Sequence, residues 1–173
     1  MKTISSLVSL TAAFAALSLA GCGKSNSSGA SAAPTEPAAS PRAVPTEGRA
    51  IEVVGNDSMK FNVTEIRVKA GEAIALTLKN AGTMPKFSMG HNWVLIENGV
   101  KVADFTSDAA QAVKTDYVPE KYAAKIIAAS KLLGPNESDT VLFYAPKRVG
   151  RYDYLCTFPG HFQVGMKGVL IVD

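Results

Sequence analysis

The sequence predicts an all-β fold, a Greek-key β-sandwich of about eight short strands with one short helical flap. Beyond residue 50, apolar residues alternate with polar or small residues, which is the period of a half-buried strand. Turn signals built from glycine, asparagine and aspartate recur at the spacing typical of a sandwich. A single stretch, residues 107–133, breaks this alternation and is predicted to form the helical flap.

The expected strands follow one another from residue 51 to residue 172. Four precede residue 80, and their alternating apolar residues are Ile51/Val53, Met59/Phe61/Val63, Ile66/Val68 and Ile74/Leu76/Leu78. Four more are expected at 92–97, 140–144, 151–156 and 167–172. We expect these short strands to pair antiparallel.

The flap is expected to contain two short helices. Ser107 is a candidate cap for the first helix. Pro119 is placed to open a second helix that carries Tyr122, Ile126 and Ile127 on one side.

The N-terminus predicts export. After Lys2 no charged residue occurs from Thr3 to Gly23, so a short basic segment precedes an apolar one, as in a signal peptide. A permanent membrane span is the alternative, which six Ser/Thr residues and many alanines disfavour. The run Leu19-Ala20-Gly21-Cys22 resembles the bacterial lipoprotein signal, which implies that residues 1–21 are removed and that Cys22 carries lipid.

Residues 22–48 are expected to be the lipidated cysteine and a flexible tether rich in Pro, Ala and Ser. The segment has too few large apolar residues to order itself. The remaining 125 residues, 49–173, are long enough for one domain with its own core. A Cys22–Cys156 disulfide is the alternative fate of the two cysteines, and it would tie the folded domain to the tether.

Composition excludes several classes of protein. Lys and Arg number 18 against 15 Asp and Glu, a net charge of +3 that is too mild for a nucleic-acid-binding surface. Two cysteines are too few for a four-cysteine zinc site, a cysteine-held iron–sulfur cluster or a multi-disulfide scaffold.

One constellation of residues predicts metal chemistry. A thiolate, an imidazole and a thioether follow one another at Cys156, His161 and Met166, and Pro159-Gly160 supplies a turn that folds His161 back towards the sulfur. The other histidine, His91, can reach this loop only through the fold. One Cys, two His and a weak axial Met are the ligands of a blue-copper electron-transfer site, with zinc as the alternative metal.

The motifs CTFPGH, GHNWVL, MKG and V-G-N-D-x-M-x-F resemble the azurin family of blue copper proteins over nearly all of residues 50–173. The resemblance implies a cupredoxin fold, a single type 1 copper and a mobile one-electron carrier that is not an enzyme. It implies three equatorial ligands, His91, Cys156 and His161, an axial Met166 and a second axial contact from the Gly90 carbonyl. It also implies that Asn92 and the amide of Phe158 hold and tune the sulfur.

Two features depart from that family. Four residues separate His161 from Met166, where azurin has three, and this count is closer to the lipid-linked auracyanins. The domain also lacks the cysteines for azurin's N-terminal disulfide.

The expected partners are redox proteins, donor and acceptor, which a monomeric carrier meets through an exposed apolar patch around His161. This patch is predicted to comprise Met89, Pro159, Phe162 and Val164, with core packing as the alternative for these residues. Trp93 is expected in the core.

The competing functions are copper storage or delivery and an oxidase. Once His91 and His161 are used, no histidine remains for a catalytic copper, which disfavours the oxidase. The lipid on Cys22 would place the carrier on a membrane of the cell envelope, facing the periplasm. Gly23 in place of aspartate favours the outer membrane.

Overall fold

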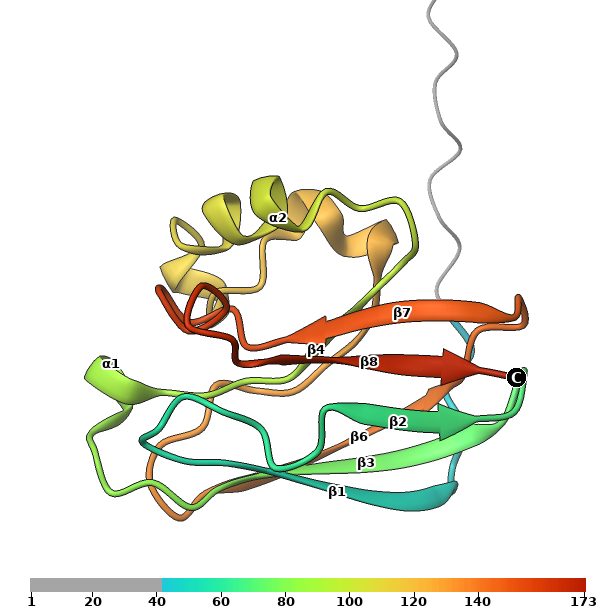
Figure 1. Ribbon diagram of the computed structural model, residues 1–173, viewed down its shortest axis with the longest axis horizontal. Coiled ribbons are helices and arrows are strands. Elements are labelled where there is room, and N and C mark those ends of the chain that lie inside the picture. The colour runs from blue at the N-terminus through green and yellow to red at the C-terminus, as the bar shows by residue number, and fades with distance from the viewer. Residues whose placement is uncertain (1–41) are drawn as a thin grey trace, which may run out of the picture. The chain divides into compact units, whose positions relative to one another are not determined.

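The computed structural model describes residues 42–173 (Figure 1). The predicted signal peptide, Cys22 and the tether up to residue 41 lie outside the described residues. Within the described part, no helix has both the length and the apolar character needed to cross a membrane.

Eight strands in the described part form two sheets that face each other, which confirms the β-sandwich (Figure 1). The smaller sheet has the order β1-β3-β6. Its strands are β1 (Arg49–Gly55), β3 (Ala73–Asn80) and β6 (Ser138–Tyr144). In β3 the predicted alternation holds, because Ile74, Leu76 and Leu78 are buried and their neighbours are not.

The larger sheet has the order β2-β8-β7-β4-β5. Its strands are β2 (Glu65–Val68), β4 (Val94–Ile96), β5 (Ile126–Ala129), β7 (Gly150–Leu155) and β8 (Lys167–Val172). All three residues of β4 are buried, since this strand lies between the other sheet and the flap.

The expectation of antiparallel pairing throughout is wrong for two pairs. β1 pairs with β3 in parallel, and β2 pairs with β8 in parallel. The chain leaves β1 for the other sheet, forms β2 there and returns as β3, so β1 and β3 run in the same direction.

The predicted strand at Met59/Phe61/Val63 is not a strand. Phe61 makes one isolated bridge to Gly55 and is buried in the core, whereas Met59 adopts a left-handed φ of 54°. The Asn56 side-chain oxygen accepts a hydrogen bond from the Ser58 amide, at 3.0 Å, which turns the chain into a loop. The alternation of apolar residues at 59–63 therefore reflects the burial of Phe61 and not a hydrogen-bonded strand.

The flap differs from its prediction in detail. It consists of α2 (Val102–Ala109), η1 (Val113–Thr115) and η2 (Glu120–Lys125). Ser107 lies inside α2, whose N-cap is Lys101, while Pro119 does precede η2. Ile126 and Ile127 belong to β5, where pairing with β4 buries Ile127 against the core.

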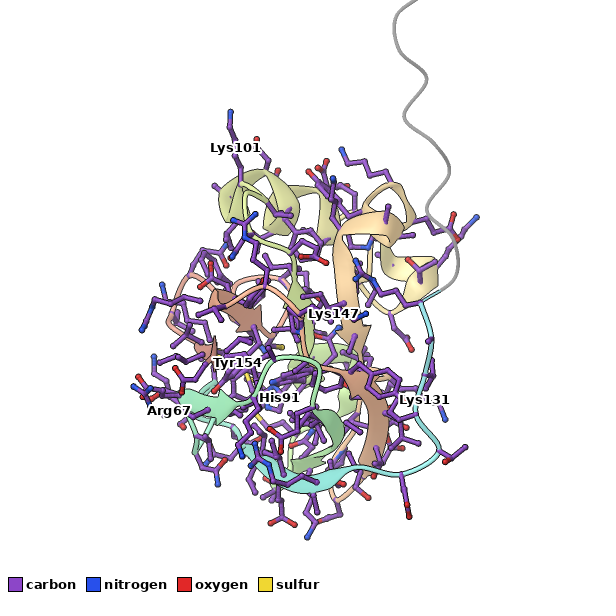
Figure 2. The ribbon with its side chains drawn as sticks, turned by 90° about the vertical axis from the view of Figure 1, so that its right-hand side faces the viewer. Arg67, His91, Lys101, Lys131, Lys147 and Tyr154 are labelled. Carbon is purple, nitrogen blue, oxygen red and sulfur yellow. The ribbon has the colours of Figure 1, made fainter. Side chains whose placement is uncertain are left out.

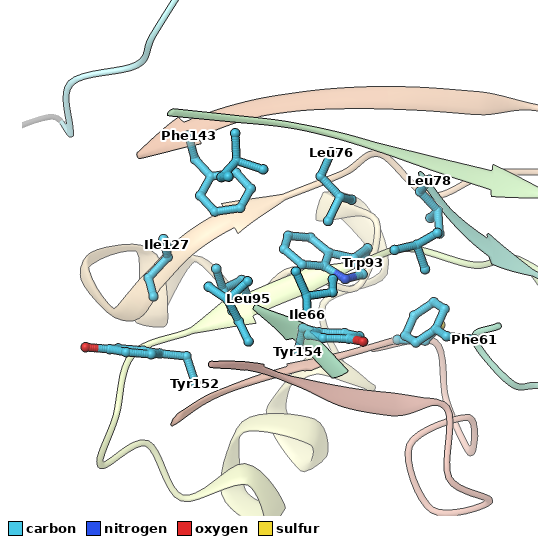
Figure 3. Packing of buried hydrophobic residues seen from close by; sticks show 14 of the residues in the cluster. Phe61, Ile66, Leu76, Leu78, Trp93, Leu95, Ile127, Phe143, Tyr152 and Tyr154 are labelled. Carbon is cyan, nitrogen blue, oxygen red and sulfur yellow. The ribbon is translucent and has the colours of Figure 1, made fainter. Parts of the chain in front are cut away.

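The core lies between the sheets and is centred on Trp93, as predicted. Trp93 has no exposed surface, and its ring lies 5.4 Å from that of Tyr154 and 5.8 Å from that of Phe143. Figure 3 shows it among Leu76, Leu95 and the other buried side chains.

The two ends of the sandwich are built differently. One end, here called the metal end, carries the helix α1 (Lys86–Met89) and the β7–β8 connection (Figure 1). The other end, here called the entry end, carries the C-terminus and the β2–β3 and β6–β7 turns, joined by a hydrogen bond from the Gly71 amide to the Pro146 carbonyl.

The last seven residues of the predicted tether, 42–48, are described and contact the domain at the entry end. The Arg42 guanidinium pairs with Glu97 at 2.8 Å and donates to the Ala124 carbonyl at 3.1 Å. Pro45 is buried, so contacts between the N-terminal segment and the domain are present from Arg42 onward.

Candidate metal centre

Three of the predicted ligands converge at the metal end. The ligand atoms of His91, Cys156 and His161 lie within 4.8 Å of one another, and all three side chains are buried. His91 follows α1 and is held by paired backbone hydrogen bonds with Leu133. Cys156 follows β7, and its amide donates to the Met166 carbonyl at 3.0 Å, which draws the two ends of the β7–β8 connection together.

The donor atoms face a common point. His91 Nδ1 and His161 Nδ1 are 3.2 Å apart, and Cys156 Sγ lies 3.4 Å from His161 Nδ1. At the far side of its ring, the buried His91 Nε2 has no hydrogen-bond partner among the described residues. Two imidazoles and a thiolate turned inward form a donor set that fits copper.

Met166 closes the same pocket. It is fully buried, and a β-carbon on Gly55 would lie 2.8 Å from Met166 Cε and 3.4 Å from His91 Cδ2. Gly55 therefore leaves the room in which the methyl end of Met166 approaches the His91 ring. The four-residue spacer after His161 thus still brings Met166 to the site.

In the metal-free pocket, burial favours the uncharged forms of all three donors, the two imidazoles and the thiol. It lowers the pKa of His91 against the opposing effects of the Asn56 carbonyl and the Asp57 carboxylate. Burial, followed by the influence of His91, lowers the pKa of His161 to about 4. Burial raises the pKa of the Cys156 thiol to about 12, although the backbone amides of Asn92 and Phe158 oppose the rise.

Asn92 and Phe158, the residues predicted to hold the sulfur, lie beside the donor residues. The Asn92 side chain accepts from the Thr157 amide at 2.8 Å and donates to the Asp116 carbonyl at 3.0 Å, so it joins the His91 strand, the Cys156 loop and the flap. The Phe158 ring contacts the His161 ring in a tilted arrangement, with 4.7 Å between centroids. Thr157 is a hydrogen-bond partner of Asn92 that the sequence does not predict, because a threonine beside a cysteine has no distinctive pattern.

Gly90, the predicted second axial contact, is buried beside His91. A β-carbon there would lie 2.7 Å from the Lys86 carbonyl and 3.0 Å from Leu132. Only glycine fits this turn out of α1.

The four residues of the predicted apolar patch differ in exposure. Pro159 and Val164 are exposed, Met89 is half-buried, and Phe162 is half-buried against the cluster beneath the flap. Lys167 covers the Phe162 ring at 4.7 Å. Two apolar residues outside the predicted patch are also exposed, Met84 just before α1 at 42% and Phe87 within α1 at 84%.

Residues 49–173 match the family of "Copper binding proteins, plastocyanin/azurin family". The chain belongs to the plastocyanin/azurin family of copper-binding proteins. Azurin-1 of Alcaligenes xylosoxydans xylosoxydans is 39% identical over 127 residues, which cover 71% of this chain and 97% of azurin-1. Outer membrane protein H.8 of Neisseria gonorrhoeae is also 39% identical over 127 residues, covering 72% of this chain and 68% of that protein.

Solved structures give the same result. The auracyanin of Roseiflexus castenholzii is 36% identical with a TM-score of 0.65, over 72% of this chain and 96% of that one. Auracyanin A of Chloroflexus aurantiacus, a "blue" copper protein, is 33% identical with a TM-score of 0.63, over 72% and 98% of the two chains. The fold is therefore that of the cupredoxins, and the chain is a blue copper protein that carries electrons and uses copper as its cofactor.

Proposed function

We propose that this family member is a lipid-anchored, type 1 copper carrier that passes single electrons between redox proteins of the bacterial cell envelope. One observation carries the proposal of electron transfer. The donor atoms of His91, Cys156 and His161 converge within 4.8 Å in a buried pocket that Met166 also enters.

In this proposal His91, Cys156, His161 and Met166 would hold the copper, with the Gly90 carbonyl as a further contact. Copper bound there supplies one-electron chemistry by alternating between Cu(I) and Cu(II). Thiolate and thioether donors favour Cu(I), while the imidazoles suit both oxidation states.

The protein contributes rigidity around the ligands. The Asn92 side chain bonds to the Thr157 amide and the Asp116 carbonyl, so the histidine strand, the cysteine loop and the flap hold one another in place. The Cys156 and Met166 backbones are also bonded directly. A ligand set that moves little needs little reorganisation when an electron arrives or leaves.

We propose that electrons pass through the apolar surface over His161. His161 itself is 2% exposed and lies under the turn that contains Pro159. Val164, Met84 and Phe87 are further exposed apolar residues, in the β7–β8 connection and at α1. A small surface of this kind suits the brief contacts of redox partners.

The proposed organisation has a signal peptide at 1–21, the lipidated Cys22 with a tether to residue 48, and the copper domain at 49–173. The lipoprotein-like sequence at Cys22 supports it. The relative from Neisseria gonorrhoeae, named as an outer membrane protein, supports an envelope location. Gly23 after the cysteine favours the outer membrane.

The test is the absorption spectrum of the protein with Cu(II), together with voltammetry. We expect an intense visible charge-transfer band and a reversible one-electron wave. Cys156→Ser should lose the band, because only a thiolate supplies the donor orbital, while circular dichroism stays that of the β-sandwich. Cys22→Ser is the matched control and should keep the band.

A band that survives Cys156→Ser would refute the ligand assignment. Bound copper without a reversible one-electron wave would instead favour storage or delivery.

A further inference from the structure

Exposed large apolar side chains lie at both ends of the sandwich. At the metal end they surround the proposed site for electron exchange. Three others lie at the entry end, and electron transfer gives no reason for them. These are Val44 at 65% exposure, Tyr144 at 45% and Val149 at 66%.

The entry-end residues surround one surface hollow. Val44 and Tyr144 line a hollow of about 560 Å³, with further apolar walls from Phe143 and Pro146. Arg42 and Lys147 line the same hollow. Val149 projects from the adjoining β6–β7 turn, and the Tyr152 hydroxyl holds this turn by donating to the Arg148 carbonyl at 2.8 Å.

The same turn carries two basic residues with no acidic partner. Lys147 and Arg148 are exposed, and neither forms an ion pair within residues 42–173. Figure 2 views the molecule from this end, with Lys147 labelled. Apolar side chains beside unpaired cations are the combination that binds the surface of an anionic membrane.

The course of the chain points to the same partner. The N-terminal segment joins the domain at the entry end through Arg42, twenty residues after Cys22. A lipid on Cys22 therefore attaches the domain from this end.

We propose that the entry surface, formed by Arg42, Val44, Tyr144, Lys147, Arg148 and Val149, rests on an anionic phospholipid membrane and directs the metal end away from it. This orientation rests on the proposed function, because it assumes the lipid on Cys22. Affinity of the entry surface for phospholipid does not depend on that lipid.

The experiment uses chain 22–173 with Cys22→Ser, so that no lipid is attached. Sedimentation compares its binding to vesicles of phosphatidylcholine with binding to vesicles that also contain phosphatidylglycerol. We expect tighter binding to the anionic vesicles, weakened by added salt. Lys147→Gln/Arg148→Gln should reduce the binding constant roughly 25-fold, at about fivefold for each charge lost.

Lys86→Gln/Lys114→Gln is the matched control, because it removes two exposed charges of the metal end and should leave binding unchanged. Equal binding to both kinds of vesicle, or equal loss in the two double variants, would overturn the proposal. A chain that binds neither vesicle and forms a dimer sensitive to Val149→Asp would assign the surface to a second copy.

Mass spectrometry of the chain from its own membrane separates the two proposals. An unmodified Cys22 alongside selective vesicle binding would refute the anchor and leave the affinity of the entry surface standing. A lipidated Cys22 without that selectivity would refute the entry surface alone.

Discussion

At the scale of single residues, the protonation of the three donors fixes how copper binding responds to pH. In the metal-free pocket the thiol has a pKa of about 12, and that of His161 is about 4. The pKa of His91 also lies below its ordinary value of 6.5. Near pH 8 both imidazoles are thus already free to bind, and only Cys156 must lose a proton.

We therefore expect the logarithm of copper affinity to rise by about one for each pH unit between about pH 7 and 9. Below the pKa values of the two imidazoles the slope should steepen, because protons then compete at the histidines as well. Competition with a chelator of known affinity across this range measures the slope. A slope near three at neutral pH would show that both imidazoles carry protons in the metal-free protein.

Gly55 packs closely against two residues of the site, Met166 and His91. Gly55→Ala places a methyl group 2.8 Å from Met166 Cε, so the thioether must move. We expect copper still to bind, with altered visible and EPR spectra and with unfolding easier by about 1–3 kcal/mol. Spectra identical to those of the wild type would show that Met166 does not contact the metal.

At the scale of elements, the β7–β8 connection is fixed from outside by the loop after β1. The Lys60 ammonium donates to the Val164 carbonyl, and a β-carbon on Gly165 would lie 2.7 Å from Lys60 Nζ. Gly165 has a left-handed φ of 97°, which turns the chain towards Met166. The loop that follows Gly55 thus holds the spacer before Met166.

The Lys60 ammonium, a nearby positive charge, favours Cu(I) over Cu(II). We therefore expect its removal in Lys60→Met to lower the reduction potential of the copper. Amide hydrogen exchange in residues 162–166 should become faster. Lys60→Arg should restore both properties, and Lys147→Met, at the other end, should change neither. Voltammetry gives the potential, and a potential unchanged in Lys60→Met contradicts the expectation.

The elements also show where reasoning from the sequence succeeds. The ligand run from Cys156 to Met166 is local, so its spacing alone predicts a metal loop. The sequence does not predict β5, because the spacing of Ile126 and Ile127 fits one face of a helix as well as a strand. Pairing with β4 makes these residues part of an edge strand. The contact between Gly55 and Met166 joins residues far apart in the chain, so no local sequence pattern predicts it.

At the scale of the whole molecule, the exposed Phe87 provides a test of whether electrons leave through the metal end. Its side chain is 84% exposed, whereas Phe162, one of the four residues of the predicted patch, is half-buried. The sequence marks both phenylalanines as apolar residues near the predicted copper loops, and only the fold decides which of them is exposed.

Phe87→Asp should slow electron self-exchange roughly tenfold or more, because a carboxylate must lose water when two metal ends meet. The copper spectrum should not change. Val149→Asp adds the same charge at the entry end and should exchange at the wild-type rate. Equal rates in all three proteins would show that another surface passes the electrons.

The single tryptophan gives the protein an intrinsic fluorescence probe. Trp93 has no exposed surface, and its Nε1 has no hydrogen-bond partner among residues 42–173. An indole with neither water nor a polar neighbour emits at the short-wavelength limit of tryptophan fluorescence. Because Trp93 packs between the sheets, the colour of this emission reports whether the sheets remain in contact, whatever happens at the surface.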